Sequence, residues 1–143
     1  MPQVEFHTGV AEPLAFACRL LRKAYRQGAR VAVTVTPDQW GDFDRLLWTF
    51  EERDFVPHVR VSRAAPAVLA RTPIWLLDER CPEQGAPTVL VNIGAESSEP
   101  WPGLDRIIEV VGDHPDDAVP ARGRWRAYES RGYPLVHHKG GAG

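Results

Sequence analysis

Residues 106–133 read RIIEVVGDHPDDAVPARGRWRAYESRGY, and this stretch decides the fold. It begins with the apolar run 107–111, which is rich in β-branched residues and ends at Gly112, as a mostly buried strand does. Residues 113–117 then supply a polar N-cap, a proline suited to the first helical position and two carboxylates at the positive end of a helix dipole. The stretch therefore predicts a strand, a tight turn and a helix in immediate succession.

The predicted helix carries an apolar stripe and several arginines. The stripe, at spacings of three and four, consists of Ala118, Ala121, Trp125 and Tyr128. The arginines of the segment are Arg122, Arg124, Arg126 and Arg131. On spacing alone, such a stripe is more often core and such arginines a solvated face. Arg122 and Trp125 are three residues apart, however, so a flat cation and a ring could flank one groove that suits a peptide with a carboxylate and a ring.

Ahead of this stretch, strands alternate with helices. Strands are expected at 4–7, 31–35, 73–77 and 88–93, with a short extended edge at 134–138. One helix is expected from about Glu12 to Gly28, and a second after Thr36, where Thr36 and Gln39 have the spacing of a capping box. The segment 60–72 has no clear pattern and is interpreted as including a loop that crosses the sheet. This alternation predicts an α/β fold with a parallel sheet covered by helices.

Composition predicts one soluble domain without targeting signals. The chain has 143 residues, 43% of them hydrophobic and 25% charged, and its net charge of −2 predicts no general attraction to nucleic acid. Cys18 and Cys81 are far apart, which suggests neither a disulfide framework nor a zinc site and fits a reducing cytoplasm. No apolar run has the length of a membrane span. Residues 1–138 are expected to form the domain, and the glycine-rich residues 139–143 a disordered tail.

Few residues point to catalysis. The sequence has neither a glycine-rich phosphate loop nor a Gly-x-Ser-x-Gly motif, so no cofactor or metal is predicted. Asp78 and Glu79 follow a predicted strand, where α/β enzymes often place active-site groups, although solvation of a strand end is the plainer interpretation. A small nucleotide-fold enzyme that uses these two carboxylates remains the alternative hypothesis.

A second aromatic region precedes the unassigned segment. The helix after Thr36 carries a stripe at positions 40, 43, 47 and 50, and Trp48 lies off that stripe, so we expect it to face outward. Residues 55–58 read Phe-Val-Pro-His, which on composition alone indicates an apolar loop beside the sheet.

These two regions together resemble a known family. The run from Arg122 to Tyr128, RGRWRAY, followed by Arg131-Gly-Tyr133, resembles the C-terminal signature of the chi subunit of bacterial DNA polymerase III holoenzyme. Trp48 followed by residues 55–58 reproduces another spacing of that family, and the resemblance extends from Val4 to about Tyr133. It implies a three-layer α/β fold, nucleotide-binding-like but without nucleotide chemistry. It also implies a cytoplasmic, non-catalytic adaptor that links the clamp loader, through psi, to the acidic C-terminal tail of single-stranded DNA-binding protein, contacting DNA only indirectly.

The resemblance also implies two sets of binding residues. The tail would be received by Val111, Arg122, Arg124, Trp125 and Tyr128. Psi or another clamp-loader subunit would be held by Trp48, Phe55, Val56, Pro57 and His58. The family has a tyrosine where Trp125 stands and a lysine where Ala118 stands. With Ala118 at this position, either the tail binds less tightly or the missing charge is supplied by Arg124 or Arg126.

Overall fold

The computed structural model describes residues 1–51, 55–96 and 100–140. The strands are β1 (Gln3–Val10), β2 (Val31–Val35), β3 (His58–Arg60), β4 (Ile74–Leu76), β5 (Val89–Ile93), β6 (Arg106–Gly112) and β7 (Leu135–Lys139). The helices are α1 (Pro13–Arg26), α2 (Trp40–Thr49), α3 (Pro66–Arg71) and α4 (Pro115–Ser130), with 3-10 turns at Pro37–Gln39 and Val61–Arg63. In the part of the chain described, no helix is long and apolar enough to cross a membrane.

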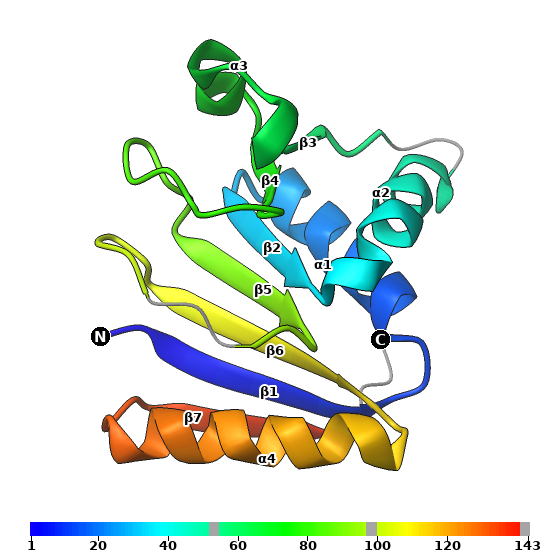
Figure 1. Cartoon of the computed structure of the whole chain (residues 1–143), viewed down its shortest axis with the longest axis vertical. Helices are drawn as coiled ribbons and strands as arrows, with labels where there is room; N and C mark the ends of the chain where they lie inside the picture. Colours follow the sequence, from blue (N-terminus) through cyan, green and yellow to red (C-terminus); the bar gives the residue numbers. More distant parts are fainter. Residues whose placement is uncertain (52–54, 97–99, 141–143) are drawn as a thin grey trace.

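The described strands form one sheet in the order β3-β4-β2-β5-β6-β1-β7, and every pairing is parallel (Figure 1). The prediction of a parallel sheet is confirmed. The extended segment expected near 134–138 is β7, which pairs with β1 at one edge. The helix α3 lies in the segment 60–72 that had no clear pattern, and β3 begins at His58, at the end of the residues interpreted as an apolar loop, and ends at Arg60. Both elements are too short for their hydrophobic periodicity to be visible in the sequence.

Helices cover both faces of the sheet, which confirms the three-layer fold. On one face α1 and α2 pack against side chains such as Val33 and Ile108. On the other, α4 packs over β1 and β6, where Phe6 and Ile107 belong to a second core cluster with α3's Leu69. Figure 1 shows α4 running alongside β1 and β7, on the side of the sheet away from α1. Adjacent residues of β6 therefore enter opposite cores, which explains why its sequence is an uninterrupted apolar run rather than an alternation.

The start of α2 differs from the expected capping box. The Thr36 hydroxyl donates to the side-chain oxygen of Gln39 at 2.9 Å, and no side chain caps a backbone N–H there. The reason is the 3-10 turn at Pro37–Gln39, in which the Gln39 N–H already donates to the Thr36 carbonyl at 2.9 Å. The capping box is thus wrong in detail, although the two residues do mark the start of the helical segment.

The helix α4 begins as predicted, with Pro115 at its first position. His114 is the N-cap, and its Nδ1 accepts from the Asp116 N–H at 3.1 Å. Pro120 lies inside the helix without ending it. Proline has no backbone N–H, so one helix carbonyl lacks its usual donor; because Pro120 is exposed, water can take the place of that donor.

The C-terminal edge is ordered further than the sequence indicated. β7 includes Lys139, and the N–H of Gly140 donates to the Thr8 carbonyl at 3.0 Å. Pairing with β1 therefore fixes two residues that had been assigned to a disordered tail, because the parallel ladder satisfies their backbone groups. The remainder of the expected tail, residues 141–143, lies outside the described residues.

Candidate functional site

A groove of about 410 Å³ lies between α4 and the edge formed by β1 and β7. It is lined by Phe6, Thr8, Gly9, Val111, Gly112, Asp113, Ala118, Ala121, Arg122, Trp125, His137 and Lys139. Three residues that the resemblance singled out, Val111, Arg122 and Trp125, are thus brought to one place from two elements. Ala118, at which that family has a lysine, lines the same groove.

An irregularity in β1 forms part of this groove. The register between β1 and β6 shifts between His7 and Val10, and Gly9 has a φ of 67° there. A side chain on Gly9 would be strained, because L residues rarely adopt such an angle. The kink ends the regular sheet just beside Val111, which leaves the groove open at the carboxyl ends of the strands.

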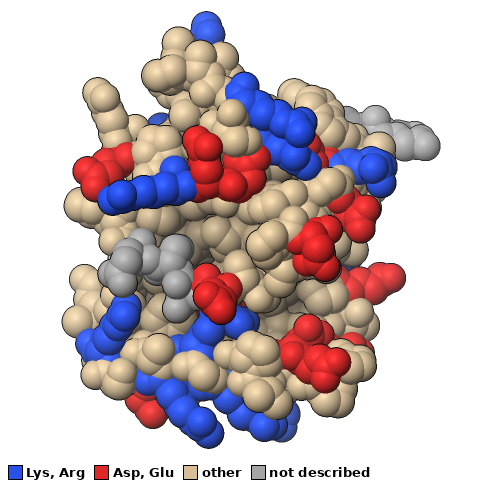
Figure 2. Space-filling model, in the orientation of Figure 1, with Lys and Arg blue, Asp and Glu red and all other residues tan. Residues whose placement is uncertain are grey.

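The groove has an apolar floor and a charged rim. The rings of Phe6 and Trp125 meet edge to face with centroids 5.1 Å apart, and the ring of His137 lies 6.0 Å from that of Trp125. Arg122 and Lys139 are exposed cations, and Asp113 is an exposed carboxylate. Figure 2 shows Lys and Arg side chains gathered over α4, and Asp and Glu side chains over its first turn. An apolar pocket with a few charged groups at its rim suits a short peptide that carries a ring and acidic groups.

Two residues expected in this groove are instead buried beneath α4. Arg124 and Tyr128 are 7% and 5% exposed and both bind Glu109, which is fully buried on β6. The Arg124 Nε donates to Glu109 Oε1 and the Tyr128 hydroxyl donates to Oε2, each at 2.9 Å. Asn92 Nδ2 donates to both carboxylate oxygens at 3.1 Å. Arg124 and Tyr128 are thus held by Glu109 and do not line this groove, whereas Arg124 lines a neighbouring opening together with Asp38 and Asp117. Their role as binding residues stays a prediction.

The buried cluster determines which way α4 faces. Burial raises the pKa of Glu109, and the Arg124 guanidinium opposes that rise by favouring the carboxylate. Burial and the nearby Glu109 carboxylate raise the pKa of Tyr128. Since residues two apart on an α-helix lie about 200° apart around its axis, holding Arg124 inward turns Arg122 outward to the groove. The sequence offered one signal for this cluster, a lone Glu109 inside an apolar strand, which our sequence reasoning missed.

The second expected site contains a stacked pair of exposed aromatic residues. Trp48 and Phe55 are 54% and 60% exposed, and their rings stack with centroids 5.1 Å apart. Trp48 faces outward as predicted, and Pro57 is half-buried beside the pair.

Val56 and His58 lie beneath this aromatic pair. Val56 is in the core, and the ring of His58 lies 4.6 Å from that of Trp48 and 3.1 Å, through Nε2, from the Asp44 carboxylate. The same carboxylate is 3.2 Å from Arg60. Val56 and His58 are buried, so they support the exposed rings, and their assignment as contact residues stays a prediction.

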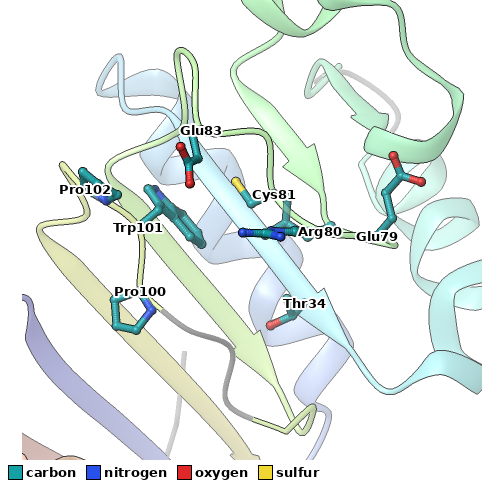
Figure 3. Close-up of a pocket in the computed structure, with 9 residues that line it drawn as sticks. Thr34, Glu79, Arg80, Cys81, Glu83, Pro100, Trp101 and Pro102 are labelled. Atoms are coloured by element: carbon teal, nitrogen blue, oxygen red, sulfur yellow. The ribbon is translucent and has the colours of Figure 1, made fainter.

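Asp78 and Glu79, the residues of the enzyme hypothesis, have different surroundings. The Asp78 carboxylate accepts from the Ser62 N–H at 2.9 Å and from the Ser62 hydroxyl, which is a structural role at the end of β4. Glu79 lines an opening of about 510 Å³ with Thr34, Arg80, Cys81 and Trp101 (Figure 3). Burial raises the pKa of Cys81 to about 11, so its thiol is a poor nucleophile at neutral pH. Within the described ranges, no cluster of three potential metal ligands occurs.

The fold and these surfaces define a class: an α/β domain of nucleotide-binding architecture that lacks a glycine-rich phosphate loop. The sequence profile of the family "DNA polymerase III chi subunit, HolC" matches residues 1–136. The chain is also 32% identical to DNA polymerase III subunit chi of Pseudomonas aeruginosa over 144 aligned residues, which cover 97% of each protein. The chain therefore belongs to the DNA polymerase III chi subunit family, whose members are non-catalytic accessory subunits in DNA replication. Membership in this family decides against the enzyme hypothesis.

Proposed function

We propose that the chain is an adaptor in the bacterial cytoplasm that binds the acidic C-terminal tail of single-stranded DNA-binding protein and links it, through psi, to the clamp loader. The observation that carries the proposal is the groove beneath α4, in which Val111, Arg122 and Trp125 line one cavity. These are the residues that match the tail-binding positions of the family.

The groove offers a partner for each chemical group at such a tail. The Arg122 guanidinium pairs with the terminal carboxylate through charge-assisted hydrogen bonds. The last side chain, a phenylalanine, packs against Val111 and the crossed rings of Phe6 and Trp125. A short flexible peptide loses ordering entropy on docking, so we expect micromolar affinity, about −7 to −8 kcal/mol. The affinity falls as salt rises, because the charges at the rim are exposed and therefore screened.

The stacked pair Trp48 and Phe55 is the proposed site for psi. Exposed, adjacent aromatic residues are typical of the centre of a protein interface. Trp48 is on α2, which covers one face of the sheet, whereas the groove lies beneath α4 on the other face. This placement lets the two partners bind at the same time, as an adaptor requires.

Fluorescence anisotropy with a labelled peptide of acidic residues ending in phenylalanine tests the tail site. Arg122→Ala is expected to weaken binding by about tenfold or more, since a hydrogen bond to a charged group contributes about 1.5–3 kcal/mol. Arg19→Ala is the matched control, because Arg19 is an exposed arginine of α1 on the opposite face. If Arg122→Ala binds like the parent, or if removing the terminal phenylalanine leaves affinity unchanged, the tail binds elsewhere.

A further inference from the structure

The groove lacks the cation that the family resemblance led us to expect on α4. Ala118 lines the groove at the position where a lysine was expected. Of the two arginines considered as replacements, Arg124 is buried against Glu109. Arg126 is exposed but is not among the lining residues. Neither Arg124 nor Arg126 therefore supplies the missing charge inside the groove.

The other cation in the lining is Lys139, at the end of β7. Its backbone is held in place, since Lys139 lies opposite Thr8 in the β1–β7 ladder and the next residue, Gly140, donates to the Thr8 carbonyl at 3.0 Å. The Thr8 hydroxyl is also 2.7 Å from His137 Nε2. The side chain of Lys139 is exposed. A fixed backbone with an exposed ammonium group is a good arrangement for binding a carboxylate, because little further ordering is needed.

The charges of the lining show why a second cation matters. Arg122 and Asp113 are of opposite sign, so these two leave the groove without net charge. Lys139 makes the groove net positive while His137 is neutral, and a net positive groove is what attracts an acidic peptide.

We propose that Lys139 is the second cation of this groove and binds an acidic side chain that precedes the terminal carboxylate of the bound tail. The proposal rests on the proposed function. The peptide is then held between two walls, with Arg122 of α4 on one and Lys139 of β7 on the other. In this chain the second cation is thus on β7 instead of at position 118 of α4, and the small side chain of Ala118 leaves room for the peptide to approach β7.

A double-mutant cycle between protein and peptide tests this pair. Anisotropy titrations would use two labelled peptides that both end in phenylalanine, one with aspartates before it and one with asparagines at the same positions. Because the ion pair is exposed, Lys139→Ala is expected to lower the affinity for the acidic peptide by about three- to fivefold and to leave the affinity for the neutral peptide nearly unchanged. Lys23→Ala is the control, because Lys23 is the chain's other lysine and is exposed on α1. In the Lys139→Ala background, Ala118→Lys is expected to restore affinity for the acidic peptide.

The outcomes separate this inference from the proposed function. If Lys139→Ala binds the acidic peptide like the parent while Arg122→Ala has lost about tenfold, Lys139 is not the second cation and the tail site stands. An equal loss for both peptides also overturns the inference, since the effect then does not depend on the acidic side chains. If Arg122→Ala and Lys139→Ala both bind like the parent, the proposed tail site itself is wrong.

Discussion

Arg122 and Arg124 are two residues apart in one helix, yet they lie in opposite environments. Arg122 is exposed at the rim of the groove, whereas Arg124 is buried and paired with Glu109. The first can bind a ligand and contributes little to folding. The second is held by Glu109 of β6 and ties α4 to the middle of the sheet. The comparison teaches that a buried ion pair can position a surface site. The contact of Arg124 with Glu109 fixes the rotation of α4 about its axis, and this rotation places Arg122 and Trp125 at the groove.

The largest expected effect comes from the buried side of this comparison. Arg124→Ala leaves the Glu109 carboxylate buried without its counter-ion and is expected to lower the free energy of unfolding by about 3–5 kcal/mol. Arg122→Ala, at an exposed position, is expected to change it by no more than about 0.5 kcal/mol. Urea denaturation followed by circular dichroism measures both. Equal stabilities for the two variants would show that the buried cluster does not anchor α4.

The second effect sharpens the contrast between exposed and buried aromatic side chains. Trp48→Ala is expected to release a clamp-loader partner, since a central interface aromatic contributes about 2 kcal/mol or more to binding. The free energy of unfolding of the same variant should stay close to that of the parent, because the side chain is 54% exposed. Co-purification of tagged protein from its own cells gives the first result and urea denaturation the second. Retention of every partner by Trp48→Ala would remove this site from the proposal.

The smallest effect concerns the other face of the β1–β7 edge. The pKa of His7 is lowered from 6.5, first by burial and then by the positive charge of the stacked His138, with Glu5 opposing and Arg106 adding to the effect. The unfolded chain thus takes up this proton more readily than the folded one, so stability is full above pH 6.5 and falls as pH drops toward the lower folded pKa.

Urea midpoints between pH 8 and 5.5 measure this loss, and His7→Gln should lose less than the parent over the same interval. The difference between parent and variant isolates His7 from other titrating groups. Identical pH profiles would mean that His7 does not contribute.

Much of the fold could be predicted because the long elements carry strong patterns. The strands β2, β5 and β6 and the start of α4 follow from apolar runs and from Pro115, and the spacing of Arg122 and Trp125 indicated a groove that both residues do line. The short β3 and α3 carry no such pattern. The different environments of Arg122 and Arg124 could not be predicted from the sequence of α4 alone, since both residues fit its polar face. The burial of Arg124 depends on Glu109, which lies on β6. Likewise, the position of Lys139 at the groove follows only from the pairing of β7 with β1.

The indole N–H signals of the five tryptophans test the central claim most directly. They report on the whole molecule: Trp125 lines the groove, Trp48 lies in the exposed aromatic pair, Trp101 lines the opening beside Glu79, and Trp40 and Trp75 lie elsewhere. In a ¹⁵N-edited spectrum, titration with the acidic peptide ending in phenylalanine should move the Trp125 signal, assigned by its loss in Trp125→Phe, and leave the other four in place. Movement of the Trp48 or Trp101 signal with Trp125 unmoved would contradict the account.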